Sequence, residues 1–432
     1  MGQLRSWLGR HNDILVNTTT LVGSGLVTSG LGFAFWIVVA RLFDVQQVGL
    51  ASAAVAAMLM LSTLGIVGLD ALLVGELAVR LKRPGAGSIG GLLSAGVTAA
   101  FASATVLGFL FAVAMWWLTP ESNLGAFFAP GLLTYVLFAL GVGLTGASFV
   151  FDRATIGLLR GGIQLKRNAL FSVLRLVLLP GLTLPFWATH RLGEAVYGLW
   201  AATTLVSLLL VVPAVLELAA GDSLRPAWRP LYGLRREAWG NHLLNLAQHG
   251  PGLLYPVIVA ALVTPALNAA FYVAWMLITF AYSLPTHLTS VLHAVGASDR
   301  SQLAEKLKVT LRLSGVAAAG TGIVLVALAD PLLRLFGPEY AEGAGAALRI
   351  LALGVLPSAI KIHYFTLARI VGFTRQAALV GFGAGLVELV AVYLGARSGS
   401  LSQMSWALLA VLGVEALLLA PVVLKFLGRS RS

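Results

Sequence analysis

"VTLRLSGVAAAGTGIVLVALADPLLRLFGPEYAEGAGAALRILALGVLPSAI", residues 309–360, consists of two apolar runs joined by a short polar turn. The runs at 309–329 and 344–368 are each long enough to cross about 30 Å of hydrocarbon as a helix. Gly337 and Pro338 interrupt the pattern between them, because neither residue favours the interior of a helix. The stretch therefore predicts two consecutive membrane-spanning helices.

The composition extends this prediction to the whole chain. Of its 432 residues, 58% are hydrophobic and only 11% are charged, more apolar side chain than a water-soluble domain of this size can bury. The chain has no cysteine, which excludes disulfides, thiolate metal sites and a cysteine nucleophile. We therefore predict an all-α polytopic membrane protein.

The apolar runs predict twelve transmembrane helices. They lie near 16–40, 47–75, 88–118, 124–150, 168–189, 194–219, 239–263, 267–295, 309–329, 344–368, 376–396 and 402–425. The longest connection, "AAGDSLRPAWRPLYGLRREAWGN" at 219–241, contains two prolines and four arginines and follows the sixth run. We predict an N-terminal six-helix lobe at 1–220, a cytoplasmic connecting loop at 221–238 and a C-terminal six-helix lobe at 239–432.

The distribution of basic residues predicts the orientation. With a cytoplasmic N-terminus, 22 of the 29 Lys and Arg residues face the cytoplasm, five face outward and two lie inside spans. Both termini are then cytoplasmic, and the first run is a retained helix rather than a cleaved signal. Because topology accounts for the net charge of +12, nucleic acid is not an expected partner. The outer connections are too short for a catalytic domain.

Two of the predicted spans carry a polar face. In the first span Asn17, Thr20, Ser24 and Thr28 recur at spacings of three and four, and in the seventh Asn241, Asn245, Gln248 and Gly252 do the same. An offset of 224 residues relates Asn17 to Asn241 and Ser24 to Gln248, as a duplicated six-helix unit would. Such faces either line a wet cavity or form hydrogen bonds between helices, and both readings remain open.

Arg175 and Lys361 lie inside apolar runs, where a charge is costly unless it is paired or hydrated. They form either a cationic site for an anionic substrate or internal salt bridges, and His363 follows Lys361 by two residues. The acidic residues that could pair with them are Asp70, Glu76, Glu217, Glu388 and Glu415.

The motifs of enzymes and of resident cofactors are absent from the sequence. No histidine and carboxylate spacing matches a zinc motif, no GxxxxGK[ST] loop is present, and no Ser–His–Asp set stands out. His242, His249, His287 and His293 are read either as proton relays or as ordinary interior histidines. We therefore expect no enzyme activity, no catalytic residues, no cofactor and no resident metal.

Residues 309–360 resemble the ninth and tenth spans of the polysaccharide biosynthesis flippases, the O-antigen-type lipid-linked oligosaccharide translocases of the multidrug/oligosaccharidyl-lipid/polysaccharide exporter superfamily. Other segments are similar in the same order: "TSGLGFAFWIVVARLFDVQQVGLASAAVAAMLMLSTLGIVGLDALLV" at 28–74, "IGLLRGGIQLKRNALFSVLR" at 156–175 and "VLHAVGASDRSQLAEKLKVTLRLS" at 291–314. The resemblance implies two lobes around a central cavity. It also implies a flippase that moves lipid-linked sugar units to the outer leaflet of the bacterial inner membrane by alternating access.

The implied substrate is a glycan on a polyprenyl phosphate or pyrophosphate, whose negative charge suits Arg175 and Lys361. Our full set of expected substrate-binding residues is Arg175, Lys361, Asn17, Ser24, Asn241, Asn245, Gln248 and His363. The other expected partners are membrane lipids and the glycan polymerase or glycosyltransferases of the same pathway. We expect a monomer.

In the opening stretch, the predicted topology places the turn at 332–344 on the outer side. Arg334 lies near the headgroups, Glu339 and Glu342 at a helix N-terminus that favours negative charge, and Tyr340 in the interfacial aromatic belt. We expect these residues to anchor an outer gate.

Three other functions remain open. A cation-coupled multidrug exporter of the same superfamily would share the fold, although such exporters typically carry an acid in the first span and none lies between Leu21 and Ala40. A membrane glycan polymerase or ligase would need a substantial outer loop. A scaffold for a glycan-assembly complex would need neither an acid in the first span nor a large outer loop.

Overall fold

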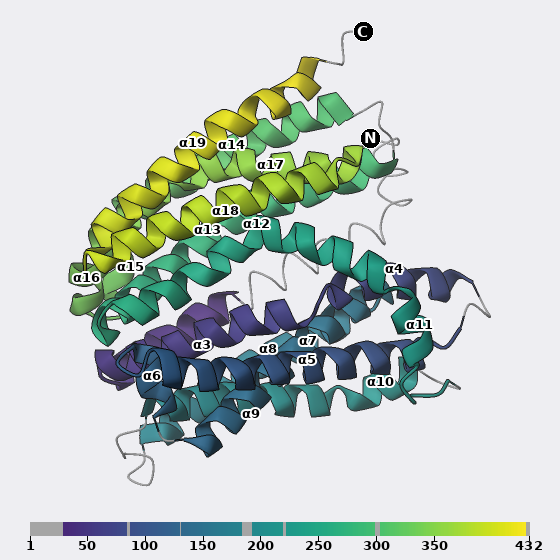
Figure 1. Cartoon of the computed structure of the whole chain (residues 1–432), viewed down its shortest axis with the longest axis horizontal. Helices are drawn as coiled ribbons and strands as arrows, with labels where there is room; N and C mark the ends of the chain where they lie inside the picture. The colour runs from purple at the N-terminus through teal and green to yellow at the C-terminus, as the bar shows by residue number, and fades with distance from the viewer. Residues whose placement is uncertain are drawn as a thin grey trace, which may run out of the picture. The chain divides into compact units, whose positions relative to one another are not determined.

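The computed structural model describes residues 29–83, 87–129, 131–183, 192–218, 222–298 and 303–428. The regular structure of this part of the chain is entirely helical (Figure 1). Its helices divide into two compact units, each of which is described separately below.

Unit 1 comprises the described part of Met1–Leu42 together with Met58–Leu118 and Phe128–His242. Its elements are the helix Ser29–Leu42, the second part of α3 (Val45–Gly65), α4 (Leu69–Lys82), α5 (Ile89–Leu118), α7 (Leu132–Gly157), α8 (Gly161–Leu178), η1 (Leu179–Thr183), α9 (Leu192–Leu210), α10 (Val212–Leu218), α11 (Trp228–Gly233) and the start of α12 (Arg235–Leu262).

Unit 2 comprises Phe43–Ala57, Thr119–Phe127 and Leu243–Ser432. Its elements are the first part of α3, most of α6 (Asn123–Phe128), the rest of α12, α13 (Pro265–Ser298), α14 (Leu303–Ala327), α15 (Ala329–Arg334), α16 (Pro338–Leu353), α17 (Val355–Val371), α18 (Thr374–Arg397) and α19 (Leu401–Gly428).

These helices confirm the predicted all-α polytopic membrane fold. Among the described residues, eight helices are long and apolar enough to cross a membrane, and the pair α16 and α17, bent by 47° at its junction, makes a ninth where it is counted as one span. The other three predicted spans correspond to α8, to α12 and to the first run, which is described from Ser29 on. Basic or polar side chains make α8 and α12 less apolar than the rest, although both lie where the sequence predicted a span.

The predicted span 47–75 is interrupted in the structure, where α3 ends at Gly65 and α4 begins at Leu69. Val67 and Gly68 between them both have a positive φ, 47° and 75°. A side chain at Gly68 would collide with the backbone carbonyl of Ala238, so glycine is needed for both its conformation and its small size. The break is therefore set by a tertiary contact that hydropathy does not report.

Small residues hold α5 and α7 together in unit 1. Ala100, Ala104 and Ala112 on α5 are fully buried and recur at multiples of four residues, which puts them on one face of the helix. Such residues allow helix backbones to approach closely in a membrane, where burial of apolar surface gives little driving force. Aromatic packing then joins α7 to α9. The rings of Phe138 and Tyr197 stack, and the Tyr197 hydroxyl donates a hydrogen bond to the carbonyl of Phe138 at 2.7 Å.

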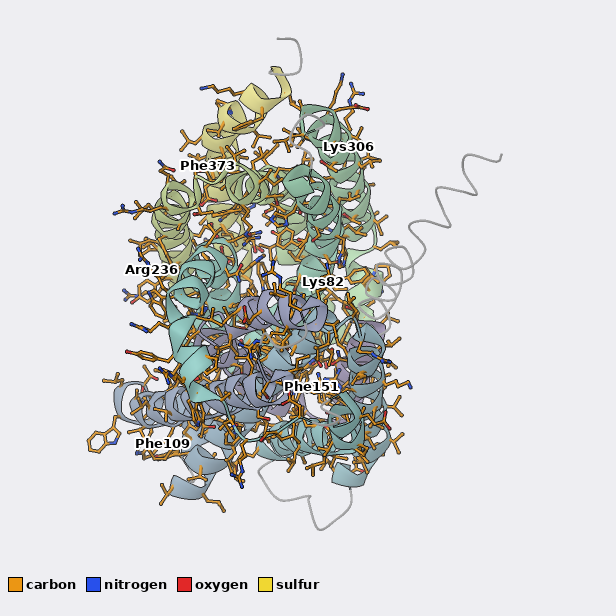
Figure 2. The ribbon with its side chains drawn as sticks, turned by 90° about the vertical axis from the view of Figure 1, so that its right-hand side faces the viewer. Lys82, Phe109, Phe151, Arg236, Lys306 and Phe373 are labelled. Carbon is orange, nitrogen blue, oxygen red and sulfur yellow. The ribbon has the colours of Figure 1, made fainter. Side chains whose placement is uncertain are left out.

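The connection that leads to α11 is tied to the start of α5 in unit 1. Figure 2 shows the side chains of the described residues. The Gly90 amide donates to Asp222 Oδ2 at 3.0 Å, and the Ala227 amide donates to the Gly91 carbonyl at 2.8 Å. Slight burial acts to raise the pKa of Asp222, but hydrogen bonds from Ser88 and from backbone amides outweigh it and lower that pKa. The carboxylate therefore lies at the N-terminus of α5, where the helix dipole favours a negative charge.

In unit 2 the long helix α13 packs against α14, α16 and α17 (Figure 1). The first part of α3 also belongs to this unit, since Asn268 on α13 donates from Nδ2 to the Gly49 carbonyl at 2.8 Å and to Ser52 Oγ at 3.2 Å. A side chain at Gly49 would collide with the backbone carbonyl of Pro265. This close backbone approach therefore depends on glycine.

We expect Gly49→Ala to lower the stability of the folded protein by about 1–3 kcal/mol, because the added methyl group overpacks a backbone contact. The measurement is the thermal unfolding midpoint of purified protein in detergent. Gly315→Ala on α14 is the matched control, because open space surrounds a side chain there and alanine favours a helix. Equal midpoints for the two variants would contradict the packing argument.

The structure confirms that the polar turn at 332–344 separates two helices, but it corrects the prediction for Tyr340. Helix α15 ends at Arg334, α16 begins at Pro338, and Glu339 lies in the first turn of α16. Tyr340, however, is fully buried and packs against Phe336 with ring centroids 6.0 Å apart. The tyrosine is therefore a core residue of unit 2 and not part of an interfacial belt.

Candidate functional site

The Arg175 side chain in unit 1 lies among three aromatic rings. Its guanidinium carbon is 4.6 Å from the ring centroid of Phe35, 4.6 Å from that of Phe171 and 4.3 Å from that of Trp200. The residue is only 2% exposed. Rings at these distances attract a cation through their faces, and the attraction grows as water is excluded. The three rings therefore hold a positive charge inside the unit, and we call this arrangement the Arg175 aromatic cage.

The cage is assembled from three helices. Phe171 precedes Arg175 by one turn of α8, Phe35 comes from the helix Ser29–Leu42, and Trp200 comes from α9. Trp200 contacts both phenylalanines edge to face at centroid distances of 5.6 Å, so the rings also support one another. Gly32 adds room, since even a methyl group there would lie 3.5 Å from Arg175 Nη2.

The second charge inside a predicted span, Lys361 on α17 of unit 2, forms an ion pair with two carboxylates. Its Nζ pairs with Glu388 Oε1 from α18 and with Glu415 Oε2 from α19, the latter at 3.0 Å. Tyr255 from α12 donates a hydrogen bond to Glu388 Oε2. Of the two interpretations of Lys361, a substrate site or an internal salt bridge, the structure therefore favours the salt bridge. Both glutamates were among its predicted partners.

His363 is fully buried, and its Nδ1 lies 2.8 Å from the carbonyl oxygen of Ala359 in its own helix. The two-residue spacing from Lys361 rotates His363 to another side of α17. The structure shows no ion pair or hydrogen bond between this described histidine and Lys361, Glu388 or Glu415.

The predicted polar faces are only partly described. Asn17 and Ser24 lie outside the described residues, as does the side chain of Asn241. Asn245 Oδ1 accepts a hydrogen bond from Arg369 Nη2 at 2.8 Å in unit 2. Gln248, also in unit 2, buries its Oε1 with no hydrogen-bond partner among the described residues. The duplicated polar face thus remains a prediction.

A buried ion pair in unit 1 was missed by the sequence reasoning, and its arginine, Arg167, lies just before the predicted span 168–189. Arg167 on α8 donates from Nε to Asp152 Oδ1 at 2.7 Å and from Nη2 to Asp152 Oδ2 at 2.6 Å. Ser207 and Asn168 complete the network. The available signal was an aspartate just after an apolar run and an arginine after the following turn.

The structure therefore divides the predicted site residues between the units. Arg175 belongs to unit 1, whereas Lys361, His363, Asn245 and Gln248 belong to unit 2. Each unit contains one buried cationic group inside a predicted span, held by aromatic rings in one and by carboxylates in the other. Ionisable groups buried at membrane depth are costly and typically mark pathways for substrates or ions.

A helical membrane fold with charges buried inside predicted spans is typical of proteins that move ions or substrates across a membrane. Residues 259–394 match the family model MatE. No curated protein matches the chain in sequence.

The comparisons with solved structures cover nearly the whole chain. An inward-facing multidrug resistance MATE family transporter of the MOP superfamily gives a TM-score of 0.65 at 16% identity, over 94% of this chain and 95% of that one. Lipid II flippase MurJ, in an inward closed conformation, gives 0.67 at 12% identity, over 94% and 89%. A MOP superfamily transporter from Pyrococcus furiosus gives 0.58 at 14% identity, over 97% and 95%. The chain thus has the fold of MATE and MOP superfamily transporters.

Proposed function

We propose that this protein is a flippase that translocates a lipid-linked oligosaccharide or polysaccharide precursor across the cytoplasmic membrane by alternating access. The observation that carries the proposal is the Arg175 aromatic cage, because it retains a cation deep in unit 1. A guanidinium binds phosphate through hydrogen bonds along its edge, while ring faces stabilise its charge from above and below. The cage therefore suits a phosphate or pyrophosphate headgroup.

The likeness in fold to Lipid II flippase MurJ supports a lipid-linked substrate. The sequence resemblance to polysaccharide biosynthesis flippases supports a glycan on that lipid. In this proposal the predicted lobes 1–220 and 239–432 alternate access around the 221–238 connection, with both termini in the cytoplasm of a bacterium. The protein acts as a monomer in its inner membrane, and glycosyltransferases or a glycan polymerase are its partners.

A cation-coupled multidrug exporter is the second candidate. The match of residues 259–394 to MatE and the likeness to multidrug resistance MATE transporters favour it. Against it stands the buried positive charge of Arg175, which repels cationic drugs through a medium that screens charge poorly. The two candidates thus differ in the charge of the substrate.

The test is reconstitution of the purified chain into liposomes that contain a polyprenyl-pyrophosphate-linked oligosaccharide with a fluorescent sugar. We expect the protein to expose inner-leaflet substrate to a membrane-impermeant quencher faster than in empty liposomes. A fluorescent phosphatidylcholine in parallel liposomes controls for nonspecific lipid scrambling. No gain over empty liposomes, together with uptake of the cationic dye ethidium, would replace the flippase by the drug exporter.

A further inference from the structure

Four side chains meet at the Lys361 ion pair, and the transport proposal gives them no separate role. They come from four helices of unit 2, with Tyr255 on α12, Lys361 on α17, Glu388 on α18 and Glu415 on α19 (Figure 1). Each is at most 9% exposed. We call these four residues the Lys361 cluster.

The charges of the Lys361 cluster do not balance. Two carboxylates face one ammonium, and the phenol is neutral, so full ionisation would leave one uncompensated negative charge in a buried site. No other basic side chain of the described chain forms an ion pair with Glu388 or Glu415. An unpaired buried charge costs several kcal/mol, and proteins usually avoid this cost by neutralising the group. One bound proton would make the cluster neutral.

Among the described residues of the surrounding helices, no other basic side chain forms an ion pair with the cluster. On α13, Tyr282 is hydrogen-bonded to Ser358. On α16, Arg349 pairs with Asp330 at 2.7 Å on the surface of unit 2. On α17, the Nδ1 atom of His363 is hydrogen-bonded to the Ala359 carbonyl. On α14, the basic residues Lys306, Lys308 and Arg312 lie toward the start of the helix.

A hydrogen bond connects the two carboxyl groups of the cluster. Glu388 also receives a donor on each oxygen, Lys361 on one and Tyr255 on the other. Glu415 pairs with Lys361 through Oε2, and its carboxyl group is hydrogen-bonded to that of Glu388. Two carboxyl groups form such a bond only when one of them carries a proton, so the pair shares a single proton.

We propose that the Lys361 cluster is a proton-binding site in which the Lys361 ammonium occupies the position that a metal cation would take between two carboxylates. The pair of glutamates holds one exchangeable proton, shared between Glu388 and Glu415. Because Nζ already engages both carboxylates, Na⁺ has no vacant oxygen cage to enter. This inference does not depend on which substrate the chain transports.

Thermal unfolding of the full-length protein in detergent tests the resident cation, with NaCl compared with choline chloride at equal ionic strength. We expect the wild type to unfold at the same temperature in both salts. Lys361→Met removes the ammonium and leaves the oxygens of two carboxylates and a phenol, so its midpoint should rise by about 5 °C in Na⁺ as the ion binds the folded state. Arg349→Met, at the surface ion pair of the same unit, is the matched control without a sodium effect.

Infrared difference spectroscopy of the wild type tests the proton and needs no variant that folds poorly. We expect the carbonyl stretch of a protonated carboxylic acid at neutral pH, lost in Glu415→Gln and retained in Asp330→Asn. In Glu388→Gln the band should also disappear, because Glu415 then pairs alone with Lys361 and ionises. A wild type that lacks the band, or that Na⁺ stabilises as strongly as Lys361→Met, would overturn the proposal.

Discussion

Replacing Asp152 by asparagine is expected to destabilise the folded protein by about 3–5 kcal/mol, the usual cost of leaving one partner of a buried ion pair uncompensated. Arg167 is 3% exposed and Asp152 is 7% exposed. Their two parallel hydrogen bonds, at 2.7 and 2.6 Å, join the end of α7 to α8. The amide keeps the size of the carboxylate but removes its charge, so the guanidinium loses its counterion within unit 1. The measurement is the midpoint of thermal unfolding in detergent.

A matched exposed pair controls this prediction. Asp330 and Arg349 in unit 2 lie 2.7 Å apart, with side chains 42% and 40% exposed. Solvent screens this pair, so Asp330→Asn should change stability by no more than about 1 kcal/mol. The double variant Asp152→Asn/Arg167→Met should recover much of the loss, since it removes the unpaired charge as well. If Asp152→Asn cost no more than Asp330→Asn, the buried pair would not be a main source of stability.

Sequence reasoning predicted the fold well where an apolar run is uninterrupted. The predicted spans 88–118, 376–396 and 402–425 correspond to Ile89–Leu118, Thr374–Arg397 and Leu401–Gly428, because length and hydropathy alone require such segments to be helical in lipid. The break at Gly68 and the bend between α16 and α17 were not predicted. Gly68 is fixed by its contact with Ala238, more than a hundred residues away in the sequence.

The sequence identified the charged residues of the candidate site by their type and position. It identified their contacts less well. A charge inside an apolar run identified Lys361, and the need to neutralise it identified Glu388 and Glu415 as candidates. Aromatic neighbours of a cation leave no comparable signal, because Phe35 and Trp200 look like ordinary membrane residues until the helices pack. Asp152 and Arg167 were overlooked for the opposite reason, since charges near the end of a span are usually solvated.

Arg175→Gln is expected to reduce translocation of the lipid-linked oligosaccharide by about ten- to a hundredfold, if the guanidinium contributes the roughly 1.5–3 kcal/mol typical of a charge-assisted hydrogen bond. Glutamine keeps a polar side chain of similar length but carries no charge for the phosphate to meet. The measurement is the initial rate in proteoliposomes, normalised to the amount of protein inserted. A matching thermal midpoint shows that the fold of unit 1 is retained.

Two further variants separate charge from geometry. Arg175→Lys keeps the charge but loses the planar guanidinium that lies against three rings, so an intermediate rate is expected. Arg397→Gln is the matched control, because Arg397 on α18 is an exposed arginine beside the ring of Tyr393 at 5.9 Å and should be dispensable. Full activity in Arg175→Gln would show that the cage only stabilises unit 1, whereas full activity in Arg175→Lys would show that the phosphate meets a point charge and not a planar fork.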